Sequence, residues 1–264
     1  MQLVPHGYTE SRIGTTRVVA RDDVLEFVLQ ALARSGTLYD YAAQAPEGET
    51  IQGRGTIHTI PGPGSERWVV RHLSHGGLLA AFTGDRFLRA GVLRPLNELL
   101  FSVMLQELGV PTPAVVAAVV YPAGPSYRGD VAREEITDAL DLAACLFGPQ
   151  RLTSTQRAGV LAEAGRLFRS IHRAGVIHPD LNIRNVLVRW SGRTPQAYIL
   201  DIEKCRTKPR LSKQARNRML SRFRRSARKF EKRTGQRIGE EEWEVFSQAY
   251  LETPSGGGSA PRRP

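Results

Sequence analysis

His178-Pro-Asp-Leu-Asn-Ile-Arg-Asn185 and, after it, Tyr198-Ile-Leu-Asp201-Ile-Glu203 are the stretches that decide the fold of this chain. Between them, residues 186–190 and 196–200 are rich in apolar and β-forming side chains, and residues 191–195 (Ser-Gly-Arg-Thr-Pro) are typical of a turn. The spacing therefore predicts a β-hairpin that separates two short polar segments, the second of which follows an apolar run.

A helix is predicted directly upstream, over residues 157–173, and Gly175 is expected to end it. Its apolar positions share one helical face: Val160, Leu161, Ala164, Leu167, Phe168 and Ile171. A helix and hairpin with a few exposed acids would be an ordinary structural element. The order of the polar residues around the hairpin is what indicates a catalytic site instead.

Asp180 and Asn185 follow His178 at a spacing that, with Asp201 after the hairpin, is the layout of a phosphoryl-transfer site of the protein-kinase type. In this layout Asp180 is the catalytic base beside the acceptor hydroxyl. Asn185 and Asp201 would hold Mg²⁺ against the nucleotide phosphates, where negative charge builds up in the transition state.

The order of the predicted elements indicates an α+β, protein-kinase-like two-lobed fold, with a β-rich N-lobe and a mainly helical C-lobe. Before residue 114 we predict a helix over 21–34, strands over 52–60 and 67–72 and a helix over 93–108; a buried strand over 114–120 and an inter-lobe connection over 133–140 follow. The expected domains are an N-terminal extension (1–50), the N-lobe (51–135), the C-lobe with basic C-terminal helices (136–252) and a disordered tail (253–264).

The N-lobe should hold the nucleotide. Gly53 and Gly55 begin its first hairpin, as a phosphate-covering loop would, although a simple β-turn explains them almost as well. Arg71 lies on the strand from which typical kinases supply a phosphate-binding Lys, so it is the candidate for that contact, and Arg differs from Lys in reach and geometry. Glu98, on the helix 93–108, is its expected ion-pair partner; an exposed helix acid is the alternative.

Composition narrows the class of protein. The chain has 264 residues and is 41% hydrophobic, and no apolar run reaches the roughly 18 residues of a membrane span. The N-terminus lacks the basic and apolar regions of a signal peptide. Two cysteines, Cys145 and Cys205, are too few for a disulfide framework or a zinc site, which favours a reducing, cytoplasmic compartment.

The net charge of +11 is concentrated in residues 204–237, which hold 15 Lys and Arg and a single acid, Glu231. A basic block of this density indicates a polyanionic partner: nucleic acid, an anionic membrane surface or a phosphorylated substrate. A solvated helix face is the alternative. Apolar residues recur in the block at helical spacing, which predicts an amphipathic helix packed on the domain: Met219, Leu220, Phe223, Ala227 and Phe230.

Seven short motifs occur in a fixed order along the chain and together make its resemblance to a known family specific. They are Gly53-Arg-Gly-x-x-His58, Val69-Val-Arg-His-x-x-x-Gly-Gly77, Asp85-Arg-Phe-Leu88, Asn97-Glu-Leu99, Leu108-Gly-Val-Pro-Thr-Pro113, His178-Pro-Asp-Leu-Asn182 and Leu200-Asp-Ile-Glu-Lys-Cys-Arg206. With these motifs the chain resembles the lipopolysaccharide kinase family, and within it the 3-deoxy-D-manno-octulosonic acid (Kdo) kinases. An Arg at position 71 is expected in that family.

The resemblance implies a sugar kinase that uses ATP and Mg²⁺ to phosphorylate a hydroxyl of Kdo on lipid A, with the 4-hydroxyl expected, during lipopolysaccharide core biosynthesis. It implies a phosphate contact for Arg71, which Glu98 orients, and a metal-binding or strand-capping role for Glu203. It also implies a peripheral location on the cytoplasmic face of the inner membrane.

The expected partners are Kdo-lipid A or a related glycolipid and, through residues 204–237, an anionic membrane surface; no nucleic acid is expected. Two alternatives stay within the enzymes: a heptose kinase of the same group and an atypical Ser/Thr protein kinase. A third is a kinase-like binding module without catalytic activity. Such a module would be expected to lose Asp180, Asn185 or Asp201, and all three are present.

Overall fold

The computed structural model describes residues 4–52, 56–74, 85–89 and 91–252. The chain divides into two compact units. The first comprises Met1–Asp138, His178–Asp180 and Tyr198–Thr207, and the second comprises Ala139–Ile177, Leu181–Ala197 and Lys208–Pro264. The chain first crosses between them after Asp138, inside the segment 133–140. The expected boundaries of the extension, the lobes and the tail remain predictions.

The first unit is built on an antiparallel sheet whose strands follow the order β1-β2-β7-β8-β5-β4-β3, with β6 also paired to β8. The strands are β1 (Tyr8–Ile13), β2 (Thr16–Arg21), β3 (Glu49–Gln52), β4 (Thr56–Pro61), β5 (Arg67–His72), β6 (Phe87–Leu88), β7 (Val115–Ala123) and β8 (Ser126–Glu134). Its helices are α1 (Leu25–Ser35), α2 (Leu38–Ala43) and α4 (Arg94–Glu107), and η3 (Ile202–Lys204) and β13 (Arg206–Thr207) complete it.

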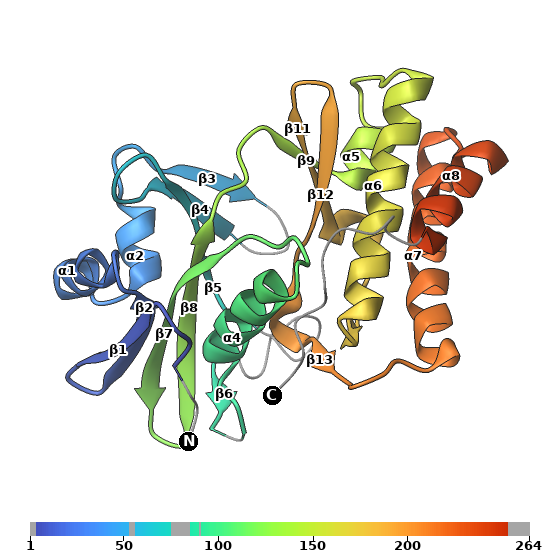
Figure 1. Cartoon of the computed structure of the whole chain (residues 1–264). Helices are drawn as coiled ribbons and strands as arrows, with labels where there is room; N and C mark the ends of the chain where they lie inside the picture. Colours follow the sequence, from blue (N-terminus) through green and yellow to red (C-terminus); the bar gives the residue numbers. More distant parts are fainter. Residues whose placement is uncertain (1–3, 53–55, 75–84, 90, 253–264) are drawn as a thin grey trace. The chain divides into compact units, whose positions relative to one another are not determined.

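Helices cover both faces of this sheet: α1 and α2 lie on one face and α4 on the other (Figure 1). Val28 and Leu32 of α1 pack in one buried cluster, and Leu96 and Leu99 of α4 in the other. Because β7 lies between the two clusters, its residues are buried on both faces, which explains why its sequence is a continuous apolar run. The buried strand predicted over 114–120 is therefore confirmed.

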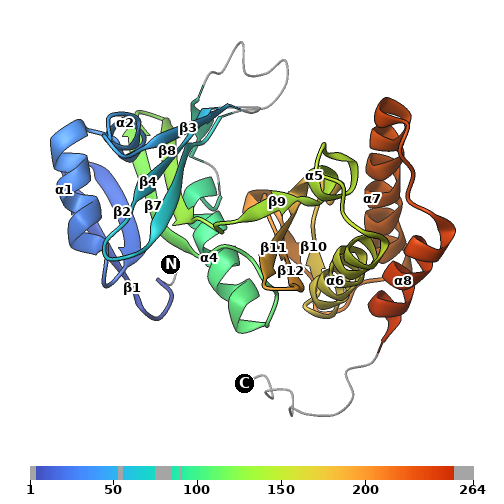
Figure 2. The ribbon, with the colours of Figure 1, turned by 90° about the horizontal axis from the view of Figure 1, so that it is seen from above.

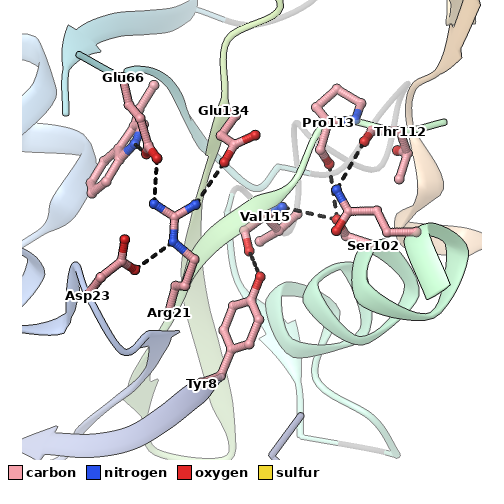
Figure 3. A network of polar contacts seen from close by, with 11 residues as sticks. Tyr8, Arg21, Asp23, Glu66, Ser102, Thr112, Pro113, Val115 and Glu134 are labelled. Atoms are coloured by element: carbon pink, nitrogen blue, oxygen red, sulfur yellow. Dashed lines mark hydrogen bonds and ion pairs between the residues drawn. The ribbon is translucent and has the colours of Figure 1, made fainter. Parts of the chain in front are cut away.

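Arg21 ties three separate parts of the first unit together at the end of β2 (Figure 3). Its guanidinium donates to Asp23 at 2.6 Å and to Glu66 and Glu134 at 2.7 Å each. The helix predicted over 21–34 accordingly begins only at Leu25, because Arg21 still belongs to the strand. In the same region the hydroxyl of Tyr8 donates to the Val115 carbonyl at 2.8 Å, which fixes β1 to β7 across β2.

The second unit is mainly helical (Figure 2). It contains β9 (Ala139–Asp141), α5 (Leu142–Phe147), α6 (Ser154–Arg173), β10 (Val176–Ile177), η2 (Ile183–Asn185), β11 (Val186–Ser191), most of β12 (Thr194–Ile199), α7 (Lys213–Thr234) and α8 (Glu240–Leu251). Its core is an aromatic cluster. Phe168 lies 4.6 Å from Phe223 and 5.5 Å from Phe246, measured between ring centroids.

The elements with strong local signals are confirmed. The helix predicted over 157–173 is α6, which begins with a capping box between Thr153 and Gln156. It ends before Gly175, whose φ of 73° is accessible to glycine without strain. The predicted hairpin is β11 and β12, and the predicted amphipathic helix is α7, which buries Met219 and Phe223. No described helix is long and apolar enough to span a membrane.

Gly165 lets α6 and α8 approach closely. A Cβ at this position would lie 2.4 Å from the Phe246 carbonyl oxygen and 3.1 Å from the Ala249 side chain. We expect Gly165→Ala to lower the free energy of unfolding by about 1–3 kcal/mol, because the backbone of α8 must move. Urea denaturation followed by circular dichroism measures the change.

Gly159 provides the matched control on the same helix. Among the described residues, a Cβ there meets only the Pro195 ring, at an ordinary 3.5 Å. Gly159→Ala should therefore stabilise the protein by about 0.5–1 kcal/mol, as expected for Ala over Gly within a helix. Equal effects of the two substitutions on the free energy of unfolding would show that close packing at Gly165 does not limit the stability of the protein.

Candidate active site

Arg71 of β5 and Glu98 of α4 form a buried ion pair in the first unit. Glu98 is 1% exposed, so the alternative of a solvent-exposed helix acid is wrong. The Nη2 atom of Arg71 also lies 3.4 Å from Oε2 of Glu203. Burial disfavours the charged guanidinium, but the carboxylates of Glu98, Glu203 and Asp201 outweigh that effect and raise the pKa of Arg71. The predicted pairing of Arg71 with Glu98 is present.

The Nε atom of Arg71 is buried and has no hydrogen-bond partner within the described part of the chain. A buried donor without an acceptor costs about 1–3 kcal/mol. Glu98 and Glu203 meet the guanidinium at Nη2, and the side chain of Arg71 keeps 20% of its surface exposed, so part of the guanidinium can still meet another acceptor. A phosphate oxygen is an acceptor that suits an arginine at this place.

Arg133 of β8 is a second cation at this site that the sequence did not single out. In the antiparallel pairing of β5 and β8, Arg133 is opposite Val69 and Arg71 is opposite Val131, so all four side chains share one face of the sheet. Burial, and after it the charge of Arg71, lowers the pKa of Arg133, while Glu98 and Asp201 oppose that shift. Only the strand register brings these two arginines together.

Asp201 has a left-handed backbone, with φ 60° and ψ 50°, at the start of η3. Among the described residues other than glycine, only Asp138 and Asp201 have positive φ. This conformation costs an L-residue about 1 kcal/mol or more and is often found at functional sites. Directly after it, Glu203 is 9% exposed and its carbonyl accepts a hydrogen bond from Asn97 at 2.7 Å. The η3 turn is therefore anchored to α4.

His178 connects the backbone of Asp180 to the residue before Asp201. Its Nε2 lies 2.9 Å from the Leu200 carbonyl oxygen, and the Asp180 N–H donates to its Nδ1 at 3.2 Å. A carbonyl only accepts and an N–H only donates, so these partners assign a neutral imidazole with the proton on Nε2. His178 is 2% exposed, and its two hydrogen bonds hold together the backbone segments that carry the two candidate carboxylates.

Asn185 belongs to the second unit, where it ends η2. This turn is held by the Asn182 side chain, which accepts from the Arg184 N–H at 2.9 Å, and by α7, whose Ser226 hydroxyl accepts from the Ile183 N–H at 3.0 Å. Gly53 and Gly55 lie outside the described residues. Within the described ranges, no group of three His, Cys, Asp or Glu side chains could hold a metal ion.

A second buried network is centred on the next residue of β5, His72, whose side chain lies on the opposite face of the sheet from Arg71. Asp130 is fully buried and accepts from His72 Nδ1 at 2.5 Å, from the Tyr121 hydroxyl at 2.7 Å and from the Tyr39 N–H at 2.9 Å. The other ring nitrogen of His72 lies 2.9 Å from Asp85. The hydrogen bond to Asp130, aided by Asp85, raises the pKa of His72 above its ordinary value of 6.5.

This shift predicts a pH dependence of stability. A raised pKa in the folded state means that the charged His72 stabilises the protein fully below pH 6.5, and that this contribution is lost as the pH rises through the folded-state value. His72→Gln, which keeps a donor for Asp130, should remove that part of the pH dependence. Denaturation of both proteins between pH 5.5 and about 9 gives the free energy of unfolding as a function of pH. If the two curves were parallel, His72 would not be the source of the pH dependence.

Comparison with known proteins identifies the family of this sequence. The model of the lipopolysaccharide kinase (Kdo/WaaP) family matches residues 44–250. The chain belongs to this family. Its members are kinases, which transfer a phosphoryl group, and this implies the use of ATP.

Named relatives are similar to the chain over most of its length. A 3-deoxy-D-manno-octulosonic acid kinase of Haemophilus influenzae (strain 86-028NP) is 30% identical over 213 residues, covering 76% of this chain and 83% of the relative. The protein of the same name from Actinobacillus succinogenes (strain ATCC 55618 / DSM 22257 / CCUG 43843 / 130Z) is 30% identical over 207 residues, with the same coverage.

A solved structure supports the fold. The structure described as WaaP in complex with acyl carrier protein matches with a TM-score of 0.57 and 17% identity, over 90% of each chain. The expected α+β, protein-kinase-like two-lobed fold is confirmed.

Proposed function

We propose that this kinase transfers the γ-phosphoryl group of ATP to a hydroxyl of Kdo on lipid A, and that the acceptor is the 4-hydroxyl. The observation that carries the proposal is Arg71, which is held by Glu98 and keeps a buried Nε–H without a partner in the described chain. The relatives named as Kdo kinases, at 30% identity over three-quarters of the chain, support the choice of acceptor.

Arg71 contacts the nucleotide phosphates in this proposal, and Glu98 orients it. Because Glu98 is buried and paired, the guanidinium is fixed before the nucleotide arrives, and little reorganisation is needed. Asp201, exposed at the end of its strand, and Asn185 are the metal ligands. Glu203 is paired with Arg71, so we assign it a supporting role there, with a metal contact as the alternative.

Mg²⁺, when bound, neutralises charge on the transferred phosphoryl group. It commonly takes only one or two protein carboxylates, with waters and phosphate oxygens completing its shell. Asp201 with Asn185 fits that requirement by donor type. The left-handed backbone of Asp201 fixes where its carboxylate stands, since few alternative conformations are open to it.

Asp180 accepts the proton of the acceptor hydroxyl. A base must be positioned as well as ionised, and His178 supplies the positioning through the Asp180 backbone. In the second unit, the Arg184 guanidinium is 62% exposed, with Nε 3.6 Å from Asp141. It is available for the carboxylate of a Kdo acceptor.

The exposed face of α7 provides a surface for an anionic membrane, and we propose a peripheral location on the cytoplasmic face of the inner membrane. Four cations line one shallow cavity on this helix: Lys213, Arg218, Arg222 and Arg225. Each Lys or Arg near an anionic surface contributes about 1 kcal/mol, so the four together give a large and salt-sensitive attraction.

We expect replacement of these four residues by Gln to lower binding to vesicles with anionic lipid at least about 100-fold. Cosedimentation at two salt concentrations measures it. The matched control replaces Arg12, Arg17, Arg86 and Arg89 of the first unit by Gln, which changes the net charge equally. Equal loss in the control would show that net charge, and not α7, governs binding.

The acceptor is tested by transfer of radiolabelled phosphate from ATP with Mg²⁺ to Kdo-lipid A, run beside a heptosylated core acceptor and a generic protein. We expect label on Kdo-lipid A, at the 4-hydroxyl, and its loss in Asp201→Asn. Label on the heptosylated core or on protein instead would reassign the acceptor while keeping the kinase. Label on none of them would overturn the proposal.

A further inference from the structure

The second unit contains a cavity of about 330 Å³ that none of the residues assigned to phosphoryl transfer lines. Three helices form it. Arg169, His172 and Arg173 come from the last turns of α6, Arg216 from the first turn of α7 and Tyr250 from the end of α8. The cavity therefore collects three guanidinium groups, an imidazole and a phenol.

One ring nitrogen of His172 is buried and lacks a partner among the residues that the structure describes. The residue is 7% exposed, and its Nδ1 lies 2.8 Å from the Tyr250 hydroxyl. Its Nε2 is buried and has no hydrogen-bond partner within the described chain. Buried side-chain nitrogens normally have one, so this atom calls for an explanation.

The protonation of the ring follows from its surroundings. Burial, and after it the charge of Arg216, lowers the pKa of His172 to about 4, so the ring is neutral at pH 7. A neutral imidazole has one donor and one acceptor. Because a phenol is a stronger donor than an imidazole N–H, Tyr250 donates to Nδ1, and the proton of His172 is on Nε2. The unsatisfied atom is thus a donor that needs an acceptor.

The charges around the cavity favour an anion as that acceptor. The side chains of Arg173 and Arg216 make no hydrogen bond or ion pair with the residues that the structure describes. Arg169 is anchored, because its Nη1 donates to the carbonyls of Ala249 and Glu252 at 2.7 Å each. Glu252 is the acid among the lining residues, and its carboxylate lies 4.0 Å from Arg166. The lining keeps a net positive charge.

We propose that this cavity binds a phosphate monoester, whose oxygens accept from His172 Nε2 and from the guanidinium groups of Arg173 and Arg216. Donors from two helices suit an oxyanion with several acceptor oxygens better than a planar carboxylate, which two parallel donors already satisfy. The volume accommodates a phosphate and a small organic group. This inference is independent of the acceptor proposed above, because binding is measured without phosphoryl transfer.

The test uses glycerol 3-phosphate as the probe, titrated into the full chain at constant ionic strength. Calorimetry gives the affinity, and NMR of the histidine rings reports on His172. We expect saturable binding that shifts the His172 resonances, and at least tenfold weaker binding in the double variant Arg173→Gln/Arg216→Gln. His172→Asn, which keeps an acceptor for Tyr250 but ends short of the Nε2 position, should lose affinity as well.

The control is Arg189→Gln/Arg193→Gln, which removes two exposed charges from the hairpin of β11 and β12 in the same unit and should leave the affinity unchanged. A second arm replaces the probe with vesicles containing phosphatidic acid and uses the same His172 shift. A shift with the soluble probe assigns the site to free monoesters, and a shift with vesicles alone assigns it to lipid headgroups. No shift with either, or equal loss in the control variant, overturns the proposal.

Discussion

Replacement of Asp180 by Asn is expected to lower kcat by about 10²- to 10⁴-fold, the usual contribution of a positioned general base. The substitution keeps the size of the side chain and removes its capacity to take a proton. It also leaves the contact to His178 intact, because that contact uses the Asp180 backbone N–H. Steady-state transfer of labelled phosphate gives kcat, and calorimetry with a non-hydrolysable ATP analogue gives nucleotide affinity.

Nucleotide affinity should change less than about threefold in Asp180→Asn, since the proposed base contacts the acceptor and not the phosphates. A matched control is Asp40→Asn, which removes an exposed carboxylate from the first turn of α2, outside the candidate site, and keeps an oxygen that can accept from the Thr37 hydroxyl. Its kcat should remain within about twofold of the parent value. Retained turnover in Asp180→Asn would remove this residue from the base role.

Replacement of Asp201 by Asn is expected to lower kcat about as much as Asp180→Asn does, but for a different reason. Losing the charge of a metal ligand costs about 4 kcal/mol of transition-state stabilisation, which corresponds to about 10³-fold in kcat. Asn tolerates the left-handed backbone that Asp201 adopts, so the turn itself should be preserved. A titration with Mg²⁺ should also show a weaker apparent affinity for the metal.

Asp138 is the natural control for this experiment. It is the other described non-glycine residue with positive φ, at 54°, and it is exposed. Asp138→Asn repeats the same chemical change on the same kind of backbone, outside the candidate site, and should leave kcat unchanged. If Asp201→Asn kept more than about a tenth of the activity, a metal role for Asp201 would be untenable.

The local sequence was sufficient to predict an element when the pattern that indicates it lies within that element's own residues. The apolar face of α6, the turn between β11 and β12 and the apolar spacing in α7 each lie within a short window, and each prediction is confirmed. The protein-kinase pattern also supplied the pairing of Arg71 with Glu98. These two residues lie on different elements, β5 and α4, so their contact could be predicted only from the known kinase pattern and not from the local sequence around either residue.

Features made by distant segments were missed. Strand β1 is half-exposed or exposed along its length, so it has no apolar pattern to reveal it. Strand β2 is buried by its pairing with β7 and by the clusters that pack on both faces of the sheet. Arg133 reaches the candidate site because β8 pairs with β5, and Arg21 is held by acids from three different segments. Such contacts depend on strand order, which residue types alone do not specify.

The position of β2 beside β7 has a practical consequence for expression of this protein. A chain trimmed to residues 44–250, the region matched by the family model, would lose β1, β2, α1 and α2. Strand β7 would then become a bare edge with unpaired peptide groups, and Val116, Ala117 and Val119, which pack in the same buried cluster as α1, would be exposed to solvent. An edge of that kind recruits strands from other molecules, so the shortened chain should precipitate where the full chain stays in solution.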